Sequence, residues 1–143
     1  MSATIREIVC KAVKTALHEN VVVDELAIPY FTDYFSDTDY GIFLASYIEE
    51  ADDNKHHFAS MVTLEFEIFG INKTVDFVAE ITRKVRLLLK ASVTATIQLS
   101  NGYAATYTTI PSVSSFVEVN DGKTTHRDVL RVNMRVDELT IDS

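Results

Sequence analysis

The sequence predicts an α+β domain in which an antiparallel, or at most mixed, sheet of about five to six strands carries two helices packed on one face. Two observations lead to this fold class. Apolar residues recur at helical spacing near the N-terminus and again between positions 74 and 90, whereas they alternate at strand spacing through much of the remainder. Turn residues separate these segments, and no linker or internal repeat divides them. We therefore expect residues 1–143 to form a single domain.

The N-terminal segment is expected to form an amphipathic helix over residues 3–18. Its apolar face is made by Ile5, Ile8, Val9, Ala12, Val13, Ala16 and Leu17. The helical period is lost after residue 18, and Pro29 with several aspartates favours an irregular connection. Residues 21–23 are expected to be briefly extended. Residues 24–41 are then predicted to be an irregular acidic and aromatic loop.

Two strands follow this loop, joined by the polar sequence ADDNK. The first covers residues 42–49 and places Ile42, Leu44, Ser46 and Ile48 on one face. The second is longer, and one face carries Phe58, Ser60, Val62, Leu64, Phe66 and Ile68. Glu65 and Glu67 occupy its other face. We expect these glutamates to face water or a neighbouring subunit.

The second helix is expected to begin after Thr74, whose side chain is suited to cap a helix N-terminus. Its apolar stripe consists of Phe77, Val78, Ile81, Val85, Leu88 and Leu89. Four more strands are predicted at residues 93–99, 103–110, 113–119 and 126–139. Glycines at Asn101–Gly102 and at Asn120–Asp121–Gly122 predict hairpin turns, because glycine readily adopts positive φ.

The charge of the chain argues against several classes of partner. Lys and Arg number 13 and Asp and Glu number 21, for a net charge of −8. This charge opposes binding to phosphate backbones or anionic lipid, so we expect no membrane partner and no sequence-reading contact with nucleic acid. The single Cys10 excludes an intrachain disulfide, which suits assembly in a reducing cytoplasm. Arg6, Glu7 and Lys11 interrupt the apolar run that a signal peptide would need.

Clusters of chemically active residues do not fit a catalytic, metal or cofactor site. An EF-hand that began at Asp37 would place Ile42 and Ile48 where glycine and glutamate are required. The adjacent His56 and His57 leave opposite faces of a strand, so they cannot readily share one metal. We therefore expect no enzyme activity, no metal and no cofactor.

The carboxylates Glu65 and Glu67 are the nearest approach to a catalytic pair. Two strand steps separate them by about 7 Å, which falls within the range of glycosidase acid pairs. Carboxylates on the exposed side of an amphipathic strand are nearly always solvated, so this pair favours a surface role. Cys10 is expected to be a buried structural thiol, because no nearby residue would lower its pKa.

Residues 29–41, PYFTDYFSDTDYG, are expected to form an interface element in which the rings of Tyr30, Phe31, Tyr34 and Phe35 pack on the domain or on a neighbour. Aromatic rings bury large areas at protein interfaces, and interspersed aspartates keep a free subunit soluble. Open sheet edges and the glutamate-bearing strand face are further surfaces that proteins usually cover. The candidate residues for contact with a second subunit or a partner are Tyr30, Phe31, Tyr34, Phe35, Tyr40, Glu65 and Glu67.

Residues 56–90, HHFASMVTLEFEIFGINKTVDFVAEITRKVRLLLK, resemble the centre of the tail terminator, or tail-completion, proteins of long-tailed bacteriophages. In that family a histidine-led strand runs through a short turn into a helix that ends in leucines. The flanking segments IREIVCKAVKTAL and RDVLRVNMRVDEL are also similar in kind, so the order of elements matches over nearly the whole chain. Residues 24–40 have no counterpart that we can place.

The resemblance implies a structural virion protein, located at the tail or neck and assembled in the host cytoplasm. Such proteins form a ring, commonly a hexamer, on the head-proximal end of the tail tube. Its partners would be further copies of this chain, the tail tube protein and the head–tail connector protein. DNA would pass through the lumen without sequence recognition, and acidic residues facing the lumen would avoid gripping it.

Two other functions stay open at this point. A head-closure or neck connector protein would have similar size and similarly featureless chemistry. A small-ligand-binding or enzymatic α+β domain would instead enclose a pocket, lined by Tyr47, Phe66, Tyr103 and Tyr107.

Replacing both Tyr34 and Phe35 with serine is expected to weaken assembly and to leave the monomer folded, because the rings would contribute buried area only at the interface. Size exclusion with light scattering measures the first effect, and circular dichroism measures the second. An unchanged oligomer would refute an interface role for these two rings.

Overall fold

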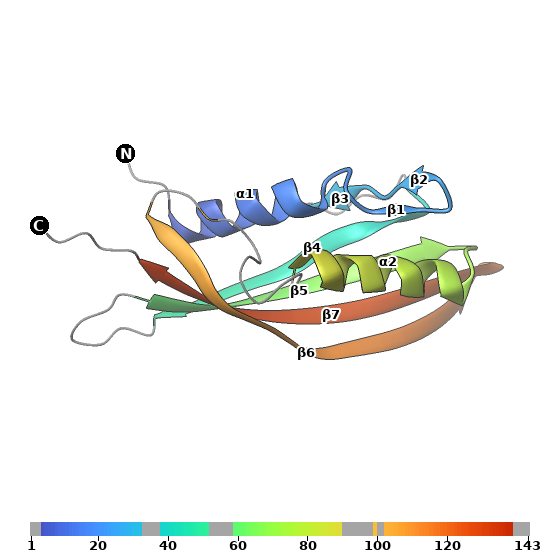
Figure 1. Ribbon diagram of the computed structural model, residues 1–143. Helices are drawn as coiled ribbons and strands as arrows, with labels where there is room; N and C mark the ends of the chain where they lie inside the picture. Colours follow the sequence, from blue (N-terminus) through green and yellow to red (C-terminus); the bar gives the residue numbers. More distant parts are fainter. Residues whose placement is uncertain (1–3, 33–37, 52–58, 90–98, 100–101, 139–143) are drawn as a thin grey trace, which may run out of the picture.

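The computed structural model describes residues 4–32, 38–51, 59–89, 99 and 102–138. These residues form two helices and seven strands (Figure 1), in the order α1 (Ile5–Leu17), β1 (Val22–Val23), β2 (Leu26–Ala27), β3 (Tyr30–Phe31), β4 (Tyr40–Ala51), β5 (Ala59–Ile71), α2 (Val75–Leu89), β6 (Tyr103–Asn120) and β7 (Lys123–Glu138). The strand expected at 93–99 lies outside the described residues except for Leu99, and so does Asn101 of the first expected turn.

Five of the strands form the main sheet, in the order β3-β4-β5-β7-β6. Neighbours in this sheet are antiparallel, except that the short β3 runs parallel to β4. Both helices lie on the same side of the sheet, and no described helix covers its other face (Figure 1). The predicted α+β class, the strand number and the placement of both helices on one face are confirmed.

Both helices begin at a threonine cap. The Thr4 hydroxyl accepts the Glu7 N–H at 3.1 Å, and the Thr74 hydroxyl accepts the Phe77 N–H at 3.1 Å. Each bond satisfies one of the backbone donors that a helix N-terminus leaves free. At the other end of α1, the Asn20 amide donates to the carbonyls of Thr15 and Ala16. The sequence prediction of a cap at Thr74 is therefore confirmed.

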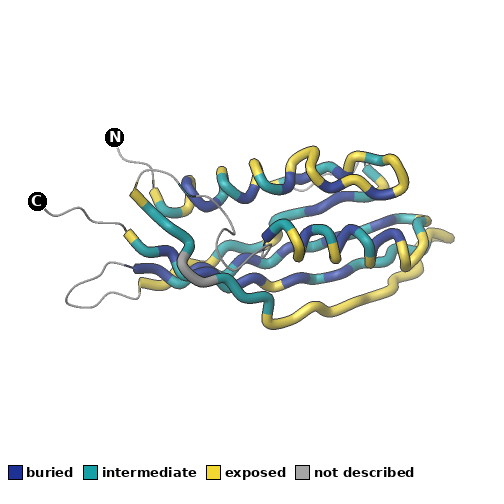
Figure 2. Tube along the Cα trace, in the orientation of Figure 1, coloured by how far each residue is buried: buried dark blue, intermediate teal, exposed yellow. Residues whose placement is uncertain are grey.

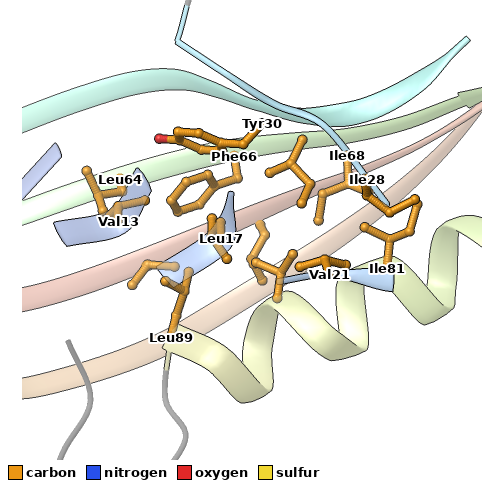
Figure 3. Packing of buried hydrophobic residues seen from close by; sticks show 14 of the residues in the cluster. Val13, Leu17, Val21, Ile28, Tyr30, Leu64, Phe66, Ile68, Ile81 and Leu89 are labelled. Carbon is orange, nitrogen blue, oxygen red and sulfur yellow. The ribbon is translucent and has the colours of Figure 1, made fainter. Parts of the chain in front are cut away.

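The core lies between the sheet and the two helices. Even-numbered side chains of β5 and β7 point into it, and directly opposed pairs such as Phe66 with Leu130 share this face. Phe66 is fully buried, and its ring lies 6.5 Å from that of Tyr30. Figure 3 shows the ring of Phe66 with Leu17 of α1 and Leu89 of α2 in the same cluster. Full burial of a side chain of this size contributes about 1.5–3 kcal/mol.

Strand β4 departs from the expected alternation because it contains a bulge. The register shifts between Leu44 and Ser46, after which Tyr47 opposes the core residue Leu64 and Ile48 opposes Thr63. An extra residue in one strand moves every later side chain to the opposite face. Ile48 was expected to share a face with Ile42, but Ile42 is buried and Ile48 is 52% exposed on the other face.

Residues 22–31 are more regular than expected. Strands β1 and β2 form a small hairpin whose two turn residues, Asp24 and Glu25, have φ of +51° and +67°. Positive φ at both central residues is typical of a two-residue hairpin turn, whose twist matches that of the flanking strands. Val21, Val23 and Ile28 are buried in the core. The predicted irregular loop of residues 24–41 therefore contains β2 and β3.

Strand β6 is one long strand, although the sequence predicted two. The register shifts between Ala105 and Tyr107 and again between Thr109 and Ser112. Pro111 lies within the second irregularity, and β6 is an edge strand, where a residue without an N–H is tolerated. The predicted turn into β7 is confirmed, because Asp121 and Gly122 have φ of +51° and +75°.

One acidic residue, Asp128 of β7, lies on the core face of the sheet and is only 8% exposed. Its carboxylate accepts hydrogen bonds from the Thr82 hydroxyl of α2 at 2.6 Å and from the Ser115 hydroxyl of β6 at 2.8 Å. A buried carboxylate without such donors would be strongly destabilising. Asp128 therefore joins the second helix to the edge hairpin.

Replacing Asp128 with alanine is expected to lower the free energy of unfolding by about 2–4 kcal/mol, because two hydrogen bonds to a charged acceptor are lost. Urea unfolding measures the change. Asp76→Ala is the control, since this exposed residue in the first turn of α2 should cost less than about 1 kcal/mol. Equal losses in both variants would contradict the assigned role of Asp128.

Candidate assembly interface

Tyr30 belongs to the core of its own chain. It is 8% exposed, and among the described residues its hydroxyl has no hydrogen-bond partner. Burial strongly raises the pKa of this hydroxyl, because the phenolate would lose its hydration. The side chain was expected to pack on its own domain or on a neighbour, and within the monomer it packs on its own domain. A contact with a second subunit or partner stays a prediction.

Two other aromatic candidates also pack within the chain. Phe31 lies over Gly41, where an added Cβ would come within 2.7 Å of the Phe31 Cε2. The Tyr40 ring meets that of Phe77 edge to face at 5.6 Å, and the Lys73 ammonium lies 5.2 Å from the Tyr40 ring. Both rings thus help to hold β3, β4 and α2 together. Tyr34 and Phe35 lie outside the described residues, so their interface role stays a prediction.

The two candidate glutamates lie on the sheet face opposite the helices, where arginines of β7 pair with them. Glu65 lies 3.2 Å from Arg131, and Glu67 lies 2.7 Å from Arg127. Arg127 also lies 3.0 Å from Glu118 of β6. Because between 29% and 55% of each of these side chains is exposed, each pair contributes no more than about 1 kcal/mol. The glutamates were expected to face water or a neighbour, and each has a partner within its own sheet.

Further polar pairs extend this ladder along the same face. Arg135 lies 3.1 Å from Asp137, and the Thr63 hydroxyl donates to the Asn133 amide oxygen at 3.2 Å. We call this surface, made by the outward side chains of β5, β6 and β7, the ladder face. Its arginines are each matched by a carboxylate, so the face presents little unbalanced charge to a passing ligand.

The edge strand β6 exposes apolar side chains that sequence reasoning did not single out. Residues 111–120 are exposed throughout (Figure 2). Val117 is 62% and Phe116 is 50% exposed, on opposite faces, and two more exposed valines, Val113 and Val119, lie beside them. Alternating valine and serine looks like an ordinary half-buried strand. One feature of the sequence does indicate apolar groups on both faces of this strand. Phe116 is followed directly by Val117, and consecutive side chains of a strand point to opposite faces.

The opposite side of the sheet has a second open edge. Strand β3 pairs only with Ile42 and Phe43 of β4. Beyond these residues, no described strand hydrogen-bonds to the outer side of β4. This edge carries the exposed Ile48, Glu49 and Glu50. The main sheet therefore ends in two unlike edges.

The N-terminal half of α1 is fixed to this second edge by a polar cluster. The Arg6 guanidinium lies 5.2 Å from the centre of the Tyr47 ring, and the Tyr47 hydroxyl donates to Glu49 at 2.6 Å. Burial and this hydrogen bond raise the pKa of Tyr47. Burial also raises the pKa of the Cys10 thiol, which Arg6 only partly offsets. Cys10 is thus a protonated, weakly nucleophilic thiol.

Two basic residues of α2, Arg83 and Lys84, have structural partners. Arg83 forms an ion pair with Glu80 at 2.6 Å and lowers the pKa of that carboxyl through the hydrogen bond. Lys84 donates to the Val22 carbonyl and so connects α2 to β1. A shallow groove beside them is lined by Arg83, Arg86, Leu87 and Ile110.

Three of the four residues expected to line a small-ligand pocket lie in or against the core. Phe66 is fully buried, and Tyr47 and Tyr103 pack against the same core. The side chain of Tyr107 lies outside the described residues. Within the described part of the chain, no group of three His, Cys, Asp or Glu side chains is arranged to hold a metal ion.

None of the described helices is long and apolar enough to span a membrane.

No protein-family model and no curated protein matches the chain. A solved structure does match: a chain in the virion of a native gene transfer agent particle superposes with a TM-score of 0.72. The match covers 95% of this chain and 99% of that chain, at 14% sequence identity. This fold occurs in a virion. At such low identity the likeness is one of fold, and it extends over essentially the whole of both chains.

Replacing Glu65, Glu67 and Glu118 with glutamine is expected to confer weak binding to double-stranded DNA, because Arg127 and Arg131 lose their partners. Gel shift at 50 mM salt measures it. With about two phosphate contacts, affinity should fall about tenfold by 200 mM salt. The control replaces three other exposed glutamates with glutamine, namely Glu7, Glu50 and Glu138. DNA binding by both triple variants would show that charge pairing on the ladder face has no special effect.

Proposed function

We propose that this chain is a structural virion protein that forms a ring at the head-proximal end of a phage tail tube. The ring ends polymerisation of the tube and provides the joint to the head connector. Two independent observations support this proposal. The fold is shared with a chain of a gene transfer agent virion. Residues 56–90 and the order of the elements resemble tail terminator proteins.

The geometry that carries the ring proposal is the pair of open sheet edges. An exposed strand edge offers a row of unpaired backbone groups, which proteins usually cover. In this chain the β6 edge is long and apolar, whereas the open part of β4 is short and carries glutamates. Unlike edges favour a head-to-tail contact between copies, and such a contact produces a ring when its rotation closes. The resemblance implies six copies.

The ladder face is the surface that suits a DNA passage. In a ring built by the sheet edges, one face of each sheet turns inward, and in this chain the helices occupy the other face. The pairing of Arg127 and Arg131 with carboxylates weakens their attraction for passing phosphates, and the net charge of −8 opposes retention further. The partners in this proposal are other copies of the chain, the tail tube protein, the head connector and DNA that is not read.

Negative-stain imaging of purified tail tubes of the parent virus, with and without the chain, tests the function. We expect caps at one end of each tube and an end to further growth. Val117→Ser should weaken ring formation and capping, since it removes an exposed apolar group from the β6 edge. Val75→Ser is the matched control, because Val75 is 57% exposed on α2.

The remaining outcomes separate the alternatives. Binding to heads that lack tails, with no binding to tubes, would favour a head-closure protein. A chain that stays monomeric and binds neither particle would contradict a virion-joint function.

A further inference from the structure

The two open edges of the sheet run in opposite directions. Each step along β4, β5, β7 and β6 is antiparallel, so β4 is parallel to β7 and antiparallel to β6. A second copy placed beside β6 in the same orientation would therefore bring its own β4 alongside as an antiparallel neighbour. Antiparallel pairing of this kind extends the sheet without any change within either subunit.

The faces of the two edges are defined by their present partners. Phe116 opposes Arg127, whose side chain is on the ladder face, and Ile48 opposes Thr63 on that same face. On the helix side, Val117 opposes His126, and Tyr47 opposes Leu64. Each edge strand thus carries two consecutive apolar or aromatic residues, one on each face of the sheet: Phe116 and Val117 on β6, and Ile48 and Tyr47 on β4.

We propose that β6 of one copy pairs with β4 of the next copy in the register that sets Phe116 opposite Ile48 and Val117 opposite Tyr47. The same register sets Ser114 opposite Glu50. Apolar pairs then meet on both faces, and cross-strand pairs of aromatic with branched residues contribute about 0.2–1 kcal/mol each relative to alanine. This inference rests on the proposed ring and names the contact that closes it.

Neighbouring registers lose these contacts. Because side chains alternate between faces, the register shifts in steps of two. A shift in one direction places Phe116 opposite Glu50 and Glu118 opposite Ile48. A shift in the other direction places Ile48 opposite Ser114 and Val113 opposite Glu49. Both shifts set an apolar side chain against a carboxylate, so the proposed register is the favoured one of the three.

The stagger that this register requires is compatible with a closed ring. Within one copy, Phe116 pairs with Arg127, and Arg127 pairs with Phe69 of β5. Ile48 pairs with Thr63 of β5. Setting Phe116 opposite Ile48 of the next copy therefore offsets adjacent copies by the six residues that separate Thr63 from Phe69. Six residues span about 20 Å along a strand, and four strand spacings span about 19 Å across it. The strands would then tilt by about 46° from the ring axis, close to the 35–45° of closed barrels.

Disulfide trapping between copies tests the register in a Cys10→Ser background. Directly opposed residues have Cα atoms about 4.5–5.5 Å apart, within the range for a disulfide, whereas diagonal neighbours lie about 7–8 Å apart. We mix Phe116→Cys chains with Ile48→Cys chains under mild oxidation, either at the protein concentration at which rings are imaged or on tail tubes. The two variants are expected to form covalent dimers. Each chain alone should stay monomeric on a non-reducing gel.

A second pair keeps the apolar contacts intact. Ser114→Cys mixed with Glu50→Cys should cross-link at least about tenfold more than Ser112→Cys mixed with Glu50→Cys, which is off register by two residues. This comparison guards against a loss of pairing caused by removal of Phe116 itself.

The outcomes distinguish this inference from the proposed function. Rings or caps that appear in images but cross-link in another register, or not at all, overturn the strand pairing and leave the ring in place. Self-linking of Phe116→Cys alone would show a symmetric β6–β6 contact instead and would also refute the head-to-tail pairing. No rings, no caps and no cross-links would refute both proposals.

Discussion

The two central strands bury their even-numbered side chains beneath both helices, and this burial decides which surfaces remain for other proteins. Phe66 of β5 and Leu130 of β7 face each other across the sheet and are fully buried under the helices. Both helices cover that face, so the other face is left to solvent and carries mainly polar side chains. The sheet is open, so each of its two outermost strands pairs with a neighbouring strand on one side only. The position of the core thus leaves two kinds of surface, a charged face and two edges.

Much of this arrangement was predictable because it is encoded locally. The alternation along β5 and the threonine at position 74 each place an element correctly, since side-chain period and capping depend on a few adjacent residues. The bulge near Ala45 was not predictable by the same means. Its sequence keeps alternating, and only the pairing with β5 shows that one residue is extra.

The candidate interface was less predictable, because exposure depends on what lies beside a residue in space. Tyr30 and Phe116 are both aromatic residues that an apolar residue follows directly, yet the first is buried and the second is half exposed. The difference arises from the face that each side chain occupies, since both strands lie at an edge of the sheet. Tyr30 points into the core beneath the helices, whereas Phe116 points to the ladder face. Likewise, the pairing of Glu67 with Arg127 joins residues that are far apart in sequence.

The turn that joins β5 to α2 also forms hydrogen bonds to the hairpin of β6 and β7, close to the hairpin turn. Asn72, at φ of +56°, donates its N–H to the Thr124 carbonyl at 2.7 Å and accepts the Thr124 N–H on its side-chain oxygen at 3.2 Å. Together with the turn at Asp121 and Gly122, these bonds fix the exposed end of β6 before any partner arrives. A preorganised edge loses less conformational entropy on association than a flexible arm would. In the proposed ring, Asn72 would therefore link the folding of the monomer to the affinity between copies, although it lies in neither strand of the proposed contact.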